Sequence, residues 1–197
     1  MMTTNYYSNS TESPVFWEQA VDYAYTESFD KADEVTDTKS KIYFSNWLMN
    51  NSKSCTKWHD TPDYSRVDGA VYNVMTDTII CFELKKRNLP STKYGDAFLT
   101  VEKYNHIKTS EAKLRQTLDA NGLQHTQIKN ILITFFSDGT FAMWDVDDWV
   151  DSQMIYMSAT TEKTYGSKRK KDVYMYRYDI KNSRMFINDI NIMYIYN

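Results

Sequence analysis

Two acidic residues and one lysine on neighbouring predicted strands are the residues of this chain best suited to chemistry. The pattern of residues 67–73 predicts a strand that carries Asp68, and residues 78–85 predict a second strand that ends on Glu83 and Lys85. Side chains alternate between the two faces of a strand, so Glu83 and Lys85 point the same way. An apolar run leads into them, which is typical of a buried strand.

The register of this predicted hairpin decides whether the two carboxylates meet. If Asn73 pairs with Thr78 across residues 74–77, Asp68 falls directly opposite Glu83. Cβ atoms of such cross-strand neighbours lie roughly 4.5–5.5 Å apart, and like charges repel there. The pair then needs compensating positive charge, for which a divalent cation bound by oxygen ligands is the natural candidate. A slip of one residue would turn Asp68 to the other face, so the cation site depends on this register.

An acidic residue on one strand and Glu-x-Lys on the next resembles the signature of the PD-(D/E)XK nuclease superfamily, with Asp68, Glu83 and Lys85 at the matching positions. The resemblance implies an α/β (α+β) fold with a restriction-endonuclease-like αβββαβ core, in which helices flank a central mixed sheet. Pro62-Asp63 lies just upstream and is the alternative first acidic position. Asp68 is preferred because Asp63 falls in a turn-like stretch before the strand.

The resemblance also implies Mg²⁺-dependent hydrolysis of DNA phosphodiester bonds, with Mn²⁺ as a substitute. Asp68, Glu83 and the backbone carbonyl of Leu84 would bind the metal, and Lys85 would hold the attacking water or stabilise the transition state. In superfamily members that cleave branched DNA, a Glu on the first helix reaches the metal, and Glu18 is similarly placed. The alternative for Glu18 is a solvent-facing helix residue.

Basic residues near the predicted site are candidates for binding DNA phosphates. Three follow the second strand, one opens the next predicted helix, and four belong to a predicted basic loop over residues 160–171. Each has the alternative of a solvated surface side chain. The predicted contacts are Lys86, Arg87, Lys93, Lys103, Lys168, Arg169, Lys170 and Lys171.

Periodicity and turn residues predict the elements around the hairpin. Ser13-Pro14 is a helix start, Asp138-Gly139 is a hairpin turn, and Asp147 is expected to flank a short helix at Trp149. We expect a frayed tail over 1–12 and one domain over 13–197, with a core at about 15–145 and extra C-terminal strands over 150–197. The predicted helices are 15–25, 39–50 and 102–121, and the further strands are 53–59, 128–136, 140–146, 173–179 and 184–196.

Composition bounds the function more loosely. A net charge of −3 does not suggest a general nucleic-acid coat, for which a basic domain is expected. Cys55 and Cys81 form neither a disulfide framework nor a zinc spacing. We see no glycine-rich phosphate-binding loop in the sequence and therefore expect no organic cofactor. We also see no signal peptide and no apolar run of membrane length, and therefore expect no membrane association. We therefore expect a cytoplasmic protein, located in a host cytoplasm if it is encoded by a phage.

The substrate and even the activity leave alternatives. Without a large specificity domain, the expected cut is directed by DNA structure, at a junction, a flap or a single strand. A Holliday junction resolvase would be a homodimer, and the aromatic C-terminal strands are candidates for that contact. The main alternative is a nuclease-fold module that binds nucleic acid without cutting, although such members usually lose one of the three signature residues. A structural or cargo protein with an incidental motif is the third option.

Overall fold

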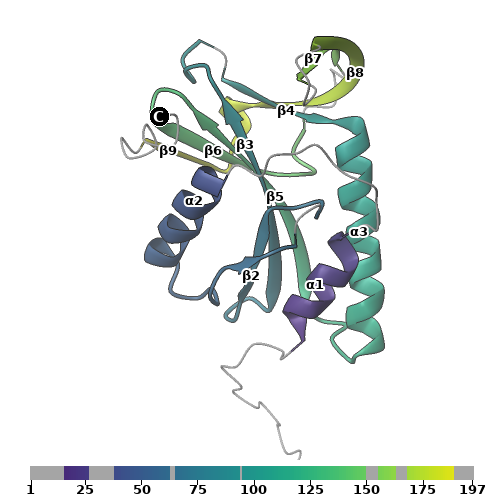
Figure 1. The fold of residues 1–197 in the computed structure, drawn as a ribbon. Helices are drawn as coiled ribbons and strands as arrows, with labels where there is room; N and C mark the ends of the chain where they lie inside the picture. Colours follow the sequence, from purple (N-terminus) through teal and green to yellow (C-terminus); the bar gives the residue numbers. More distant parts are fainter. Residues whose placement is uncertain are drawn as a thin grey trace, which may run out of the picture.

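The computed structural model describes residues 16–26, 38–62, 65–93, 95–149, 155–162 and 168–188. Among these residues, two helices come first, four strands follow, and α3 separates these from the remaining strands, so the fold contains both helices and strands as predicted (Figure 1). The predicted tail, the Ser13-Pro14 helix start and Asp63 lie outside the described residues. The elements are α1 (Trp17–Tyr25), α2 (Thr38–Asn51), β1 (His59–Asp60), β2 (Gly69–Asn73), β3 (Thr78–Arg87), β4 (Asp96–Thr100), α3 (Val101–Ala120), β5 (Gln127–Phe136), β6 (Thr140–Asp145), β7 (Ile155–Glu162), β8 (Lys168–Asp179), the 3₁₀ turn η1 (Ile180–Asn182) and β9 (Met185–Asn188).

A six-stranded mixed sheet forms the centre of the molecule, with the strand order β1-β2-β3-β5-β6-β9. β3 and β5 pair in parallel, and the other neighbours are antiparallel. Two parallel neighbours need a long crossover, and the segment containing β4 and α3 supplies it. A second, antiparallel sheet with the order β4-β8-β7 lies beside the first. The predicted central mixed sheet is confirmed.

The hairpin of β2 and β3 has the predicted register. Asn73 pairs with Thr78 and Gly69 pairs with Phe82. The Asn73 side chain accepts hydrogen bonds from the backbone N–H groups of the next residues in the loop, which is how Asn stabilises a tight turn. The loop ends at Asp77, whose positive φ of 47° closes the connection into β3.

Gly69 allows the close approach of β1 that fixes the start of β2. A Cβ atom at this position would lie 2.0 Å from the Trp58 ring, so no side chain fits there. The Trp58 ring stacks on Phe82 with ring centroids 5.5 Å apart. The glycine therefore lets an aromatic ring cover the hairpin immediately next to Asp68.

Helices cover both faces of the central sheet. Figure 1 shows α1 and α3 on one side and α2 on the other. Along β3, Ile79 and Cys81 join the core under α1 and α3, while Phe82 joins the core under α2 with Phe44. Burial on both faces explains the continuous apolar run, as is typical of a central strand next to a parallel neighbour.

The long helix α3 lies within one residue of its predicted bounds. The Thr100 hydroxyl caps it by accepting a hydrogen bond from the Lys103 backbone N–H. At the other end, Gly122 has a φ of 79° after the C-cap Asn121, the left-handed geometry that ends many helices. The capped first turn places Lys103 over the end of β3, which matters for the site.

The C-terminal region differs from the prediction. Most of the supposed basic loop over residues 160–171 belongs to β7 and β8, which pair from Ile155–Met175 to Glu162–Lys168. Of the predicted last strand, only β9 is described, and it extends the central sheet beside β6. The short helix expected at Trp149 is absent from the described residues, where a turn follows β6 instead. A polar, basic stretch can form a strand when a partner strand supplies the backbone hydrogen bonds.

Candidate active site

Asp68 lies immediately before β2 begins, close to Glu83 on β3. The Asp68 backbone N–H donates to the Phe82 carbonyl at 2.7 Å, although Phe82 is the ladder partner of Gly69, so the regular pairing stops here. The Asp68 carboxylate then accepts a hydrogen bond from the Leu84 N–H at 2.6 Å. This contact holds Asp68 beside Glu83, on the sheet face covered by α1 and α3. The two carboxylates therefore lie close enough for the charge of Glu83 to act on Asp68, although the strand pairing itself stops at Gly69 and Phe82.

Glu83 is buried and contacts two lysines. Its side chain is 3% exposed, with Oε1 2.6 Å from Lys85 Nζ and Oε2 3.1 Å from Lys103 Nζ. Burial raises the pKa of Glu83, but the positive charges of Lys85 and Lys103 outweigh it and hold the pKa below its usual value. Glu83 is therefore ionised at neutral pH in spite of its burial.

Asp68 has the opposite electrostatic situation. Burial and the negative charge of Glu83 raise the pKa of Asp68 to about 6, against the smaller opposing effects of the Leu84 hydrogen bond and the lysine charges. The two lysines lie on Glu83 and compensate Asp68 incompletely. The carboxylate pair is consequently short of positive charge on the Asp68 side.

Lys103 has a role that the sequence did not reveal. It was predicted to contact DNA, but its side chain is only 13% exposed and its ammonium group is bound to Glu83. The signal in the sequence was the capping threonine three residues earlier, which fixes the first turn of α3. The sequence pattern does not show that α3 crosses over β3, so it does not connect Lys103 with Glu83.

Glu18 does not join the carboxylate pair. It is exposed on α1, whose buried face carries Trp17 and Tyr25. Trp17 stacks on Tyr72 near the far end of β2 from the pair, whereas the Tyr25 carbonyl accepts a hydrogen bond from the Arg66 N–H. The helix therefore starts far from the carboxylate pair and ends close to it. Glu18 lies in the first turn, at the end of the helix that is far from the pair.

The remaining basic candidates fall into separate environments. Lys86 and Lys93 are exposed beyond the site, as phosphate contacts would require. Arg87 packs against β4, where its guanidinium lies 5.0 Å above the centroid of the Phe98 ring and bonds the Asp96 carbonyl. The four basic residues over 168–171 lie on the strand β8. Their contact with DNA stays a prediction.

A small, hard cation is the metal that this donor set would suit. Among the described residues, no three or more His, Cys, Asp or Glu side chains gather closely enough to hold a metal ion. Two carboxylates and the Leu84 carbonyl would be a sparse ligand set, which suits Mg²⁺ because this ion keeps several of its waters. The pKa of Asp68 supports the same conclusion, since a cation beside it would supply the missing positive charge.

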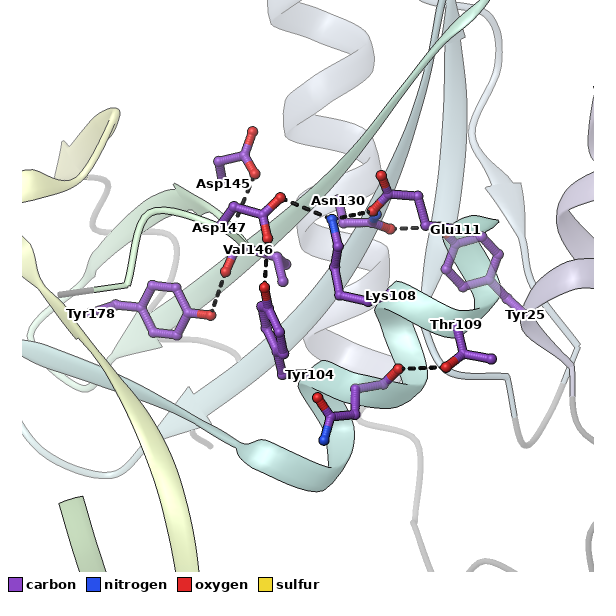
Figure 2. A network of polar contacts seen from close by, with 11 residues as sticks. Tyr25, Tyr104, Lys108, Thr109, Glu111, Asn130, Asp145, Val146, Asp147 and Tyr178 are labelled. Carbon is purple, nitrogen blue, oxygen red and sulfur yellow. Dashed lines mark hydrogen bonds and ion pairs between the residues drawn. The ribbon is translucent and has the colours of Figure 1, made fainter. Parts of the chain in front are cut away.

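A second polar cluster lies further along the same sheet face. It consists of Tyr25, Asn130, Glu111, Lys108, Asp147 and Tyr104, and Figure 2 shows the chain of contacts that they form. Asn130 accepts from the Tyr25 hydroxyl at 2.7 Å and donates to Glu111 at 2.9 Å. Lys108 bridges Glu111 at 2.7 Å and Asp147 at 3.0 Å. This cluster ties α1, β5 and the turn after β6 to α3.

Comparisons with known proteins add a fold likeness. No family model and no curated protein matches this chain. Among solved structures, the chain is similar to Hjc, a Holliday junction resolvase from the archaeal hyperthermophile Archaeoglobus fulgidus, with a TM-score of 0.43 and 8% sequence identity over 79% of this chain and 95% of that one. None of the described helices is long and apolar enough to span a bilayer.

Proposed function

We propose that this chain is a Mg²⁺-dependent endonuclease that hydrolyses DNA phosphodiester bonds, with Mn²⁺ as a substitute. One observation carries the proposal: Asp68 lies near a buried, ionised Glu83, and the ammonium group of Lys85 is 2.6 Å from Glu83. Buried ionised groups are unfavourable unless they work as a unit. Hydrolysis of a phosphodiester uses such a unit, because it needs both metal ligands and a positive charge.

Each residue has a distinct part in this proposal. Asp68, Glu83 and the Leu84 carbonyl would hold a Mg²⁺ ion, which lowers the pKa of a bound water and offsets charge on the phosphate. Lys85 is the more accessible lysine, at 37% exposed, and would orient the attacking water or bind the developing oxyanion. Lys103 is more buried and would keep Glu83 ionised and in place.

The substrate we propose is branched or single-stranded DNA. Thr100, the last residue of β4, pairs with Met175 and directly precedes α3. The earlier part of β8, which contains the basic residues 168–171, pairs with β7 alone and extends past β4 (Figure 1). A basic hairpin beside the start of α3 would contact backbone phosphates without reading base sequence.

The test is cleavage of a synthetic four-way junction, a flap, single-stranded DNA and supercoiled plasmid, each with Mg²⁺, Mn²⁺ or EDTA. We expect metal-dependent cleavage that is lost in Glu83→Gln and in Lys85→Met. Symmetric nicks in the junction, together with a dimer by light scattering, would identify a resolvase. Absence of cleavage of every substrate in both metals would refute the nuclease proposal.

A second candidate follows from the ion pairs of Glu83. Because both of its oxygens are bound to lysines, the same geometry could serve a module that binds nucleic acid and does not cut. That module would bind the junction equally well in Mg²⁺ and in EDTA. A nuclease would instead gain thermal stability from Mg²⁺ in the absence of DNA, and Asp68→Asn would remove this gain.

A further inference from the structure

A buried hydroxyl beside the candidate site lacks a partner. Thr134 lies on β5 and is 1% exposed, and its Oγ1 has no hydrogen-bond partner among the described residues. Burying a hydroxyl without a partner is unfavourable, so such a group in a folded protein calls for an explanation. A polar group reserved for another state of the molecule is one such explanation.

The register places this hydroxyl next to Lys85. Thr134 pairs with Lys85 across the parallel strands β3 and β5, and partners in register share a sheet face. On its other side Thr134 pairs with Ala142, and its neighbours along β5 on the same face are the apolar Leu132 and Phe136. Lys85 is therefore the polar side chain directly beside Thr134 in the sheet.

The other polar groups nearby are already engaged. Arg87, diagonal to Thr134, bonds the Asp96 carbonyl, and the Thr140 hydroxyl donates to Asp138. Glu83, on the other diagonal, accepts from both lysines. A hydroxyl oxygen can accept a hydrogen bond from an ammonium group, and Lys85 is the group whose partner would change in the proposed reaction.

We propose that Thr134 is a positioning residue, whose hydroxyl accepts the Lys85 ammonium group once Glu83 turns its carboxylate to a bound divalent cation. This inference rests on the proposed function. In the structure, Lys85 is held by Glu83 at 2.6 Å. Asp68 and Glu83 would hold the cation, and Glu83 would then share its oxygen less with Lys85, for which the Thr134 hydroxyl is a further acceptor within the sheet. Thr134 supplies this acceptor from a rigid central strand.

The decisive variants are Thr134→Val, which keeps the shape and removes the hydroxyl, and Thr134→Ser, which keeps the hydroxyl. Thr126→Val is the matched control: Thr126 is also 1% exposed, but its hydroxyl donates to Asp77 at 2.9 Å, just before β5 begins and away from the site. We expect Thr134→Val to melt in EDTA at or above the wild-type temperature, because it loses an unpaired hydroxyl. Thr126→Val should melt lower and cleave normally.

Two readouts test the role of Thr134. In cleavage, Thr134→Val should lower kcat by about 10- to 100-fold, the range seen when an outer-shell partner is lost, with KM little changed. In chemical labelling of lysine amines with acetic anhydride, followed by peptide mass spectrometry, Lys85 of Thr134→Val should react faster than wild type in Mg²⁺ and equally in EDTA. Thr134→Ser should behave like wild type in both.

The outcomes separate this inference from the proposed function. If wild-type protein cuts DNA and Thr134→Val cuts equally fast, the inference fails and the nuclease stands. If neither wild type nor any variant cuts any substrate, the nuclease proposal fails. The labelling still reports whether Thr134 contacts Lys85. Equal labelling of Lys85 in wild type and Thr134→Val with Mg²⁺, or Thr134→Ser as impaired as Thr134→Val, would overturn the inference.

Discussion

The two polar clusters on the α1 and α3 face of the sheet differ in how fully their groups are paired. In the cluster of Figure 2, Asp147 accepts from Tyr104 and from Lys108, and Asn130 uses both atoms of its amide. Burial lowers the pKa of Lys108, but the bonds to Glu111 and Asp147 outweigh it and raise the pKa above its usual value, so ionisation is favoured.

In the cluster around Asp68 and Glu83, the balance is the reverse. Ionisation of Asp68 is disfavoured by burial and by Glu83, and the Thr134 hydroxyl is unpaired among the described residues. Completed polar networks hold elements together, whereas buried groups whose bonding is incomplete are found at sites that change partners during function. The comparison agrees with the structural role that we infer for one cluster and the chemical role that we propose for the other.

The largest expected effect separates the clusters by activity. Glu83→Gln should lower metal-dependent cleavage by about 10³-fold or more, because it would remove the proposed metal ligand and the negative charge that holds two lysines. The control is Glu111→Gln, which changes a carboxylate of the structural cluster and should leave cleavage near wild type. Single-turnover rates on the best substrate measure both. Equal losses in the two variants would contradict the assignment of roles.

The next effect separates the clusters by stability. Asn130→Ala leaves the Tyr25 hydroxyl and the Glu111 carboxylate without a bond that each makes, and should lower the free energy of unfolding by about 2–4 kcal/mol. Tyr25→Phe removes only one of these bonds and should cost about 1 kcal/mol. Urea denaturation measures both changes. A cleavage defect in folded Asn130→Ala as deep as that of Glu83→Gln would argue against a purely structural cluster.

A smaller effect of opposite sign is expected at Asp68. Its pKa is raised from 3.8 to about 6 in the folded protein. The folded state thus binds the proton more tightly than the unfolded state, and stability falls as the pH rises from about 4 to about 6. Asp68→Asn keeps an oxygen to accept the Leu84 N–H and removes the charge. In EDTA at pH 7 it should be about 1–3 kcal/mol more stable than wild type.

Denaturation of both proteins across this pH range, with EDTA present, provides the measurement. The stability difference should shrink as the pH falls and approach zero only below the unfolded-state pKa of 3.8, where both states of wild-type Asp68 hold the proton. An Asp68→Asn protein that is less stable than wild type at neutral pH would show that the carboxylate charge is favourable, and the electrostatic part of the metal argument would be lost.

Local sequence patterns were sufficient for the elements that depend on neighbours in the chain. The loop over 74–77 and the alternating strands predicted the β2–β3 register, which is confirmed from Gly69 to Asn73, so the approach of Asp68 to Glu83 followed from neighbours in the chain. The bounds of α3 and the Asp138-Gly139 turn were predictable for the same reason. The α/β class with a central mixed sheet is confirmed.

Contacts between elements far apart in the sequence were not predictable in this way. Lys103 reaches Glu83 because α3 crosses over β3, and Thr134 lies beside Lys85 because β3 and β5 pair in parallel. The basic run near residue 170 lacks the apolar alternation of a buried strand, so it was predicted as a loop although it pairs with β7. Each of these outcomes depends on a partner that local periodicity does not reveal.

The smallest expected effect is at Glu18, and it tests the direction of α1. The resemblance to nucleases that cut branched DNA suggested that Glu18 reaches the metal, but it is exposed at the end of α1 where Trp17 packs on Tyr72. Glu18→Gln should therefore change kcat and the Mg²⁺ dependence by no more than about twofold, as for an ordinary surface substitution. A loss of about tenfold or more, with unchanged melting in EDTA, would mean that α1 rearranges when DNA binds.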